Sequence, residues 1–163
     1  MTFTNFSRRM AGFSFIELLA SATILGLLAT IAVPFVETTV KRQKEHELHL
    51  ALREIRQGID AYKQATASGR IASLPEQSGY PPSLTELVAG ADDLAHIGGP
   101  KLYFLRRVPR DPFFPDATVV AIETWGLRSF ASAPERPRAG NDVFDVYSLS
   151  SKTGLNGVPY VEW

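Results

Sequence analysis

The chain has 163 residues, in which 17 Lys and Arg are balanced by 17 Asp and Glu, so its formal net charge is zero. This balance leaves no surplus of positive charge for binding nucleic acid, and the length is that of one small domain. Cysteine is absent, which excludes disulfides and thiol catalysis.

The N-terminal region combines a polar leader with a long apolar run. Residues 1–12 include Arg8 and Arg9, and residues 13–33 are long enough to cross a hydrocarbon core of ~30 Å at ~1.5 Å per residue. Glu17 is the only ionisable side chain in this run. A carboxylate within a membrane helix costs roughly 2.5–3.5 kcal/mol, and less near the interface. The surrounding apolar residues offset this cost, so we expect insertion and a positively charged partner for Glu17.

The position of small residues distinguishes this segment from a secretory signal. Such a signal has its cleavage site after the apolar core, whereas Ala11 and Gly12 precede it here. Residues 12–19, Gly-Phe-Ser-Phe-Ile-Glu-Leu-Leu, resemble the class III signal of type IV pilins and type II secretion pseudopilins. The resemblance implies that a prepilin peptidase cuts between Gly12 and Phe13 and methylates the new amine of Phe13.

The same resemblance gives expected roles to three further residues. Glu17 matches the acid that pairs with the N-terminal amine of a neighbouring subunit in a filament. Gly26 and Pro34 match a glycine that loosens the helix and a proline that kinks it, so all three residues are expected to serve assembly. The alternative interpretation is an uncleaved single-span anchor in which Glu17 is incidental.

The helix is expected to continue as an amphipathic segment over residues 35–67, after a membrane and filament-core segment over 13–34. Its apolar residues recur in steps of four and three, which places them on one face. They are Leu48, Leu52, Ile55, Ile59 and Tyr62. Charged residues, among them Arg56 and Lys63, fill the other faces. We predict that the apolar stripe packs against the protein's own head, with a coiled-coil seam of about two heptads as the alternative.

Residues 68–163 predict a globular head in which a helix precedes strands. Ser83 and Glu86 have the spacing of a capping box, which predicts a helix over 83–89 that ends at Gly90. Branched and aromatic residues predict strands over 118–124, 127–132 and 143–149, with an edge strand over 158–163. The expected fold is therefore α+β, with a long N-terminal helix packed on a small antiparallel sheet.

Three head segments extend the resemblance. Residues 80–84, 108–113 and 145–148 look like the corresponding segments of the major pseudopilin (G type) of type II secretion. This implies a structural subunit of a periplasmic pseudopilus, with a cytoplasmic N-terminus, one span in the inner membrane and a periplasmic head. The implied partners are copies of the chain, other pseudopilins, a prepilin peptidase/methyltransferase and an inner-membrane assembly platform. The alternative is a type IV pilus pilin or a minor pseudopilin, serving adhesion, motility or DNA uptake.

The C-terminal part of the head contains candidate calcium ligands. Many major pseudopilins bind calcium in a loop rich in glycine and aspartate, and the corresponding residues here are Asn141, Asp142 and Asp145. Their oxygens are of the type that calcium prefers, although the spacing matches no EF-hand loop. Ordinary capping of the loop by these side chains is the alternative.

The sequence offers little for catalysis. His46 and His49 lie three residues apart without the pattern or third ligand of a zinc hydrolase. No Gly-x-Ser-x-Gly sequence or glycine-rich phosphate loop is present. We therefore expect that the protein is not an enzyme.

Overall fold

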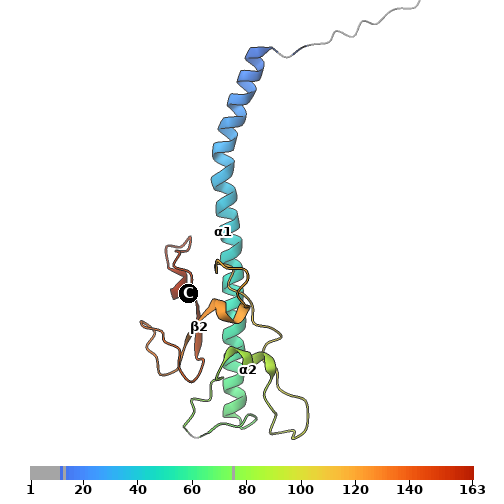
Figure 1. Ribbon diagram of the computed structural model, residues 1–163, viewed down its shortest axis with the longest axis vertical. Coiled ribbons are helices and arrows are strands. Elements are labelled where there is room, and N and C mark those ends of the chain that lie inside the picture. Colours follow the sequence, from blue (N-terminus) through green and yellow to red (C-terminus); the bar gives the residue numbers. More distant parts are fainter. Residues whose placement is uncertain (1–11, 13, 75) are drawn as a thin grey trace, which may run out of the picture. The chain divides into compact units, whose positions relative to one another are not determined.

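The computed structural model describes residues 12, 14–74 and 76–163. A long N-terminal helix and a small antiparallel sheet confirm the predicted α+β, pilin-like fold (Figure 1). The chain divides into two compact units, residues 1–40 and 41–163. The elements in chain order are α1 (Phe15–Ala67), α2 (Leu84–Ala89), the 3₁₀ helix η1 (Ala121–Thr124), β1 (Trp125–Arg128), β2 (Asp145–Ser148) and the 3₁₀ helix η2 (Tyr160–Glu162).

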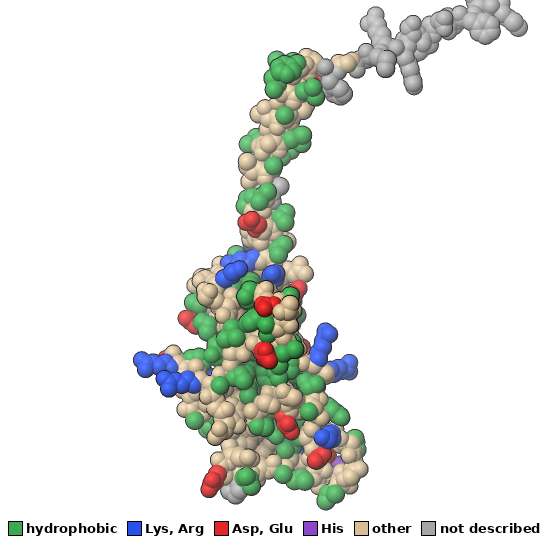
Figure 2. Space-filling view, viewed as in Figure 1, with side chains coloured by type: hydrophobic (Ala, Val, Ile, Leu, Met, Phe, Trp, Pro, Cys, Tyr) green, Lys and Arg blue, Asp and Glu red, His purple; other side chains and the backbone are tan. Residues whose placement is uncertain are grey.

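The first unit exposes the apolar part of α1. Phe15 and Ile16 are 76% and 74% exposed, and nine further large apolar side chains are exposed between Leu18 and Val36. Figure 2 shows these side chains along the N-terminal part of the helix. By length and composition, α1 is able to cross a membrane. Because a water-exposed surface of this kind is unfavourable, the unit requires lipid or other apolar helices around it.

In the second unit, the predicted stripe forms one side of the core. Leu48, Leu52, Ile55, Ile59 and Tyr62 are all buried, which confirms packing against the head rather than a coiled-coil seam. They belong to one buried core together with residues of the later part of the chain, namely Leu84, Leu87, Leu105, Trp125, Val143, Val146 and Tyr160. Figure 1 shows α2 and β2 beside this part of α1. Burying each large apolar side chain contributes about 1.5–3 kcal/mol.

The predicted short helix is confirmed as α2, but its cap differs from the prediction. Ser83 is the N-cap residue, yet its side chain makes no capping hydrogen bond. Leu84 and Leu87 are buried, so packing of one face stabilises the helix. The helix ends at Gly90, which has φ of 77° and donates its N–H to Glu86 O at 3.1 Å. A side chain at Gly90 would be strained by this φ, and its Cβ would lie 2.9 Å from the Tyr103 ring.

Two of the predicted strands form the sheet, although both are shorter than expected. β1 pairs antiparallel with β2, with Trp125 opposite Ser148 and Arg128 opposite Asp145. Beyond Arg128, Ser129 N donates to Arg138 O instead of to β2. The strand predicted over 127–132 therefore begins two residues earlier and ends at Arg128. The strand predicted over 143–149 is limited to residues 145–148.

The other two predicted strands are wrong. Residues 118–124 form a loop followed by η1, and the carbonyl oxygen of Val119 accepts a hydrogen bond from the Arg110 guanidinium instead of from a neighbouring strand. At the C-terminal end, η2 replaces the expected edge strand. Here the Tyr160 ring is fully buried and stacks on Phe113, with ring centroids 4.1 Å apart. Local propensity for a strand was overridden by these tertiary contacts.

Candidate assembly site

Glu17 lies in the first turn of α1, on a segment whose other described side chains are apolar or small. It is exposed, and within the described residues its carboxylate has no hydrogen-bond or ion-pair partner. Thr23 and Thr30, in contrast, donate their hydroxyls to Leu19 O and Leu27 O at 2.8 and 2.7 Å. These hydroxyls are satisfied within the helix, so Glu17 is the group that most needs a partner in an apolar environment.

The other residues predicted for processing and assembly lie before and after Glu17 in the chain. Gly12 is exposed, whereas Phe13 and residues 1–11 lie outside the described residues. A Cβ on Gly26 would meet no atom within 4 Å, so the chain itself leaves open space there. Pro34 lies inside α1, where it removes one backbone donor. The cleavage site and the roles of these residues in assembly remain predictions.

The head contains an ion-pair cluster that sequence reasoning missed. Arg56 was predicted to be an exposed residue of the polar faces, but it is half-buried, with 38% of its side chain exposed, and it binds three residues of the head. Its Nε donates to Asp145 Oδ1 at 2.7 Å, and its Nη2 donates to Val146 O and Trp163 O at 3.1 and 2.7 Å. Lys63 is likewise half-buried, with its ammonium donating to Ser78 O and lying 5.0 Å from the centre of the Tyr80 ring. Residues from distant parts of the chain provide these partners, so no local pattern could have indicated them.

A second cluster joins two of the segments that carried the resemblance. Asp111 is fully buried and accepts hydrogen bonds from Ser148 Oγ at 2.6 Å and from Phe113 N at 2.7 Å. Its own N–H donates to Thr124 Oγ1 at 3.1 Å. The loop at residues 108–113 is thereby attached to β2 by a hydrogen bond between two buried polar side chains.

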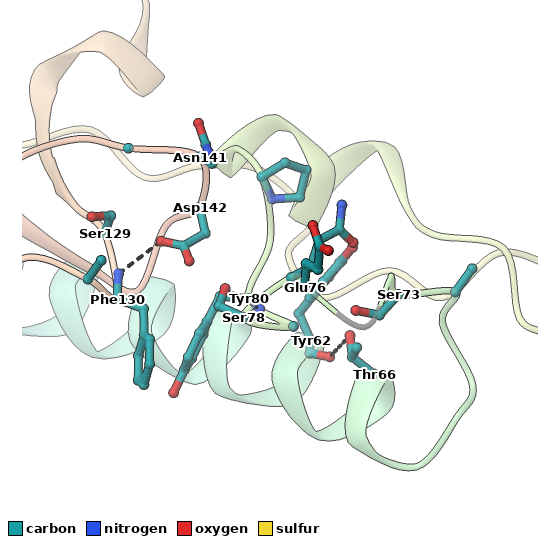
Figure 3. Close-up of a pocket in the computed structure, with 16 residues that line it drawn as sticks. Tyr62, Thr66, Ser73, Glu76, Ser78, Tyr80, Ser129, Phe130, Asn141 and Asp142 are labelled. Atoms are coloured by element: carbon teal, nitrogen blue, oxygen red, sulfur yellow. Dashed lines mark hydrogen bonds between the residues drawn. The ribbon is translucent and has the colours of Figure 1, made fainter.

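The three candidate calcium ligands do not converge. Asn141 and Asp142 line an open groove of about 980 Å³, together with Tyr62, Tyr80 and Phe130. In Figure 3 the Asp142 carboxylate turns toward the Phe130 amide, which donates to its Oδ1 at 2.9 Å. Asp145 is not among the groove-lining residues, and its two carboxylate oxygens face Arg56 and Arg128. Within the described residues, no group of three or more His, Cys, Asp or Glu side chains could hold a metal ion. The residues present therefore do not fit a calcium site.

A third acid of the head, Asp93, is buried in an ion pair. The side chain of Asp93 is 4% exposed and receives both Nε and Nη2 of Arg70, at 3.2 and 2.6 Å. These hydrogen bonds from Arg70 hold the pKa of Asp93 well below its ordinary value, with further contributions from His96 and the Ala95 amide.

A separate polar contact joins α1 to η2, where Glu45 Oε1 accepts a hydrogen bond of 2.8 Å from the Tyr160 hydroxyl. Burial, followed by that hydrogen bond, raises the pKa of the Tyr160 phenol.

Comparison with known proteins identifies the N-terminal segment. Residues 7–33 match the family model described as the prokaryotic N-terminal methylation motif. This motif is the pilin and pseudopilin signal, and it supports a type IV pilin-like protein. No curated protein and no solved structure matches the chain.

Proposed function

We propose that the protein is a structural subunit of the periplasmic pseudopilus of type II secretion, and that it is not an enzyme. Cleavage after Gly12 would release Phe13 as a methylated first residue. The subunits would then leave the inner membrane and polymerise through the N-terminal part of α1, with the heads in the periplasm. The growing filament would help to export folded proteins across the outer membrane.

One observation carries this proposal. The methylation motif continues directly into a helix whose apolar side chains are exposed on all sides, with a single carboxylate at Glu17. An anchor needs only the apolar surface, and the acid makes insertion less favourable. A filament uses both features, because the apolar surface packs against other helices while Glu17 meets a neighbour's N-terminal amine. Such a pair also fixes the axial register between subunits.

The proposal is tested by replacing Glu17 in the complete secretion system. Glu17→Leu is expected to insert into the membrane and to be cleaved after Gly12, yet to give few filaments and little cargo release. Removing Glu17 leaves the neighbour's N-terminal amine uncompensated in an apolar core, which costs roughly 3–5 kcal/mol. Glu37→Gln is the matched control, because this acid is exposed and follows the apolar run. Sheared-filament yield and cargo release are measured against total membrane-bound subunit.

The outcomes of this experiment separate the alternatives. Intact mass of the membrane-extracted protein should show loss of residues 1–12 and gain of one methyl group. Normal filaments and secretion from Glu17→Leu would favour the anchor interpretation and contradict the proposal. Long surface pili from the unmodified chain, without any effect on cargo release, would instead indicate a type IV pilus pilin.

A further inference from the structure

We propose that Arg56 and Arg128 together neutralise Asp145, for which the resemblance implied a calcium ion, so that the C-terminal part of this head closes on α1 without metal. The inference concerns the folding of the single subunit and does not depend on polymerisation. The fold separates the expected calcium ligands, with Asn141 and Asp142 at the groove and Asp145 away from it.

Both carboxylate oxygens of Asp145 are already occupied by guanidinium groups. Oδ1 lies 2.7 Å from Arg56 Nε, and Oδ2 lies 3.2 Å from Arg128 Nη2. Oδ1 also accepts the Val146 N–H at 2.8 Å. These are charge-assisted hydrogen bonds to a carboxylate of which 26% of the side chain is exposed. A calcium ion approaching this carboxylate would be repelled by the two guanidinium charges, and it would have to break their hydrogen bonds to take their place.

Arg56 performs the connecting role that a metal ion has in a loop. A calcium ion joins segments by collecting oxygen ligands from each of them. The Arg56 guanidinium collects oxygens in the same way, because it also donates to the main-chain oxygens of Val146 and Trp163. One side chain of α1 therefore holds β2 and the residue after η2. The planar fork of five donors makes arginine suited to this task, and lysine would not reproduce it.

Arg128 is fixed on the other side of the carboxylate. It lies opposite Asp145 in the sheet register, its side chain is only 17% exposed, and its guanidinium carbon is 4.5 Å from the centre of the Phe144 ring. Packing over this ring holds the charge in place at low entropic cost. Each carboxylate oxygen of Asp145 thus accepts a hydrogen bond from an arginine that the fold holds in place.

The other expected ligands cannot complete a site elsewhere. Asp142 uses one carboxylate oxygen to cap the Phe130 amide, and Asn141 lies beside it at the exposed edge of the groove in Figure 3. One acid and one amide are too few for an ion that takes six to eight oxygen ligands, unless water supplies most of them.

The experiment measures melting temperatures of the full-length subunit in detergent, with either millimolar calcium or a chelator. The unmodified protein should melt at the same temperature in both. Arg56→Ala should lower the melting temperature by roughly 5–10 °C, since it removes the contacts of one guanidinium with three residues. Arg53→Ala is the matched control, because Arg53 lies on the same helix and is exposed; it should shift melting by less than about 2 °C.

A double substitution separates charge neutralisation from simple packing. In the Arg56→Ala background, Asp145→Asn should cost less than it does in the unmodified chain, because the carboxylate has already lost a partner. If Arg56→Ala does not fold, Arg56→Lys is measured instead and is expected to remain destabilised. A rise in melting temperature with calcium in the unmodified protein, or equal effects of Arg56→Ala and Arg53→Ala, would overturn the inference. Either result leaves filament formation, measured separately, untouched.

Discussion

The hydroxyl of Ser148 on β2 lies 2.6 Å from a carboxylate oxygen of Asp111, and both residues are fully buried. They are 37 positions apart in the sequence. Asp111 accepts a second hydrogen bond from Phe113 N, and Ser148 Oγ accepts one from Ser150 N at 3.1 Å. A buried acid therefore organises a loop, a strand and the segment that follows the strand.

Removing the Ser148 hydroxyl should destabilise the head without changing its charge. Ser148→Ala leaves a buried carboxylate oxygen without its donor, and we expect a loss of about 1–3 kcal/mol in the free energy of unfolding. Ser151→Ala is the control, because Ser151 is exposed on the same segment, and it should change stability by less than about 0.5 kcal/mol. Chemical denaturation of the two variants provides the measurement. Equal midpoints would show that the buried hydrogen bond contributes nothing.

The apolar stripe of α1 predicts a second stability difference. Ile55→Ala or Ile59→Ala removes a fully buried side chain and should cost about 2–5 kcal/mol. Glu54→Ala, at an exposed neighbouring position, should cost less than about 0.5 kcal/mol. Thermal melts of the three variants compare the two faces directly. If the exposed and buried substitutions lowered the melting temperature alike, the assignment of the faces would be incorrect.

Gly126 should not tolerate a side chain. It lies opposite Tyr147 in the sheet, and a Cβ placed on it would approach the Tyr147 ring to 2.3 Å. Gly126→Ala therefore forces the ring or the strand to move, and we expect the free energy of unfolding to fall by about 1–3 kcal/mol. Combining it with Tyr147→Ala should recover part of this loss, because the clash is then absent. Additive effects of the two substitutions in a double-mutant cycle would argue against a direct clash.

The Arg70–Asp93 pair predicts a loss of stability in acid. Because the fold lowers the pKa of Asp93, the ionised carboxyl stabilises the folded state above the ordinary pKa of aspartate, about 3.9. That contribution is lost as the pH falls through this value toward the lower folded pKa. Asp93→Asn should therefore reduce the dependence of the denaturation midpoint on pH between about pH 6 and pH 3.

Asp92→Asn is the control for this pH dependence. The Asp92 side chain is 86% exposed, and its contact with Lys101 is 4.0 Å long. This neighbouring acid should leave the pH dependence of the midpoint close to that of the unmodified chain. If both variants flattened the curve by the same amount, the Arg70–Asp93 pair could not be its source.

The sequence by itself determined the long helix and the unusual position of Glu17. Apolar composition over residues 13–33 and the spacing from Leu48 to Tyr62 are local patterns, and a helix presents them on defined faces whatever the rest of the chain does. The short helix ending at Gly90 could also be predicted from the sequence, because glycine is the residue that most readily adopts the positive φ found at this helix end. The family signal at residues 7–33 likewise depends on adjacent residues alone.

Only the tertiary structure decided which polar groups meet and which segments become strands. Arg56 and Asp145 are 89 positions apart, and nothing in their neighbourhoods distinguishes this pair from surface charges. Residues 118–120 have the composition of a strand, yet the carbonyl oxygen of Val119 binds Arg110 instead of a neighbouring strand. Such pairings depend on where the loops bring distant backbone and side-chain groups, and each buried polar group must then take the partner available in that packing.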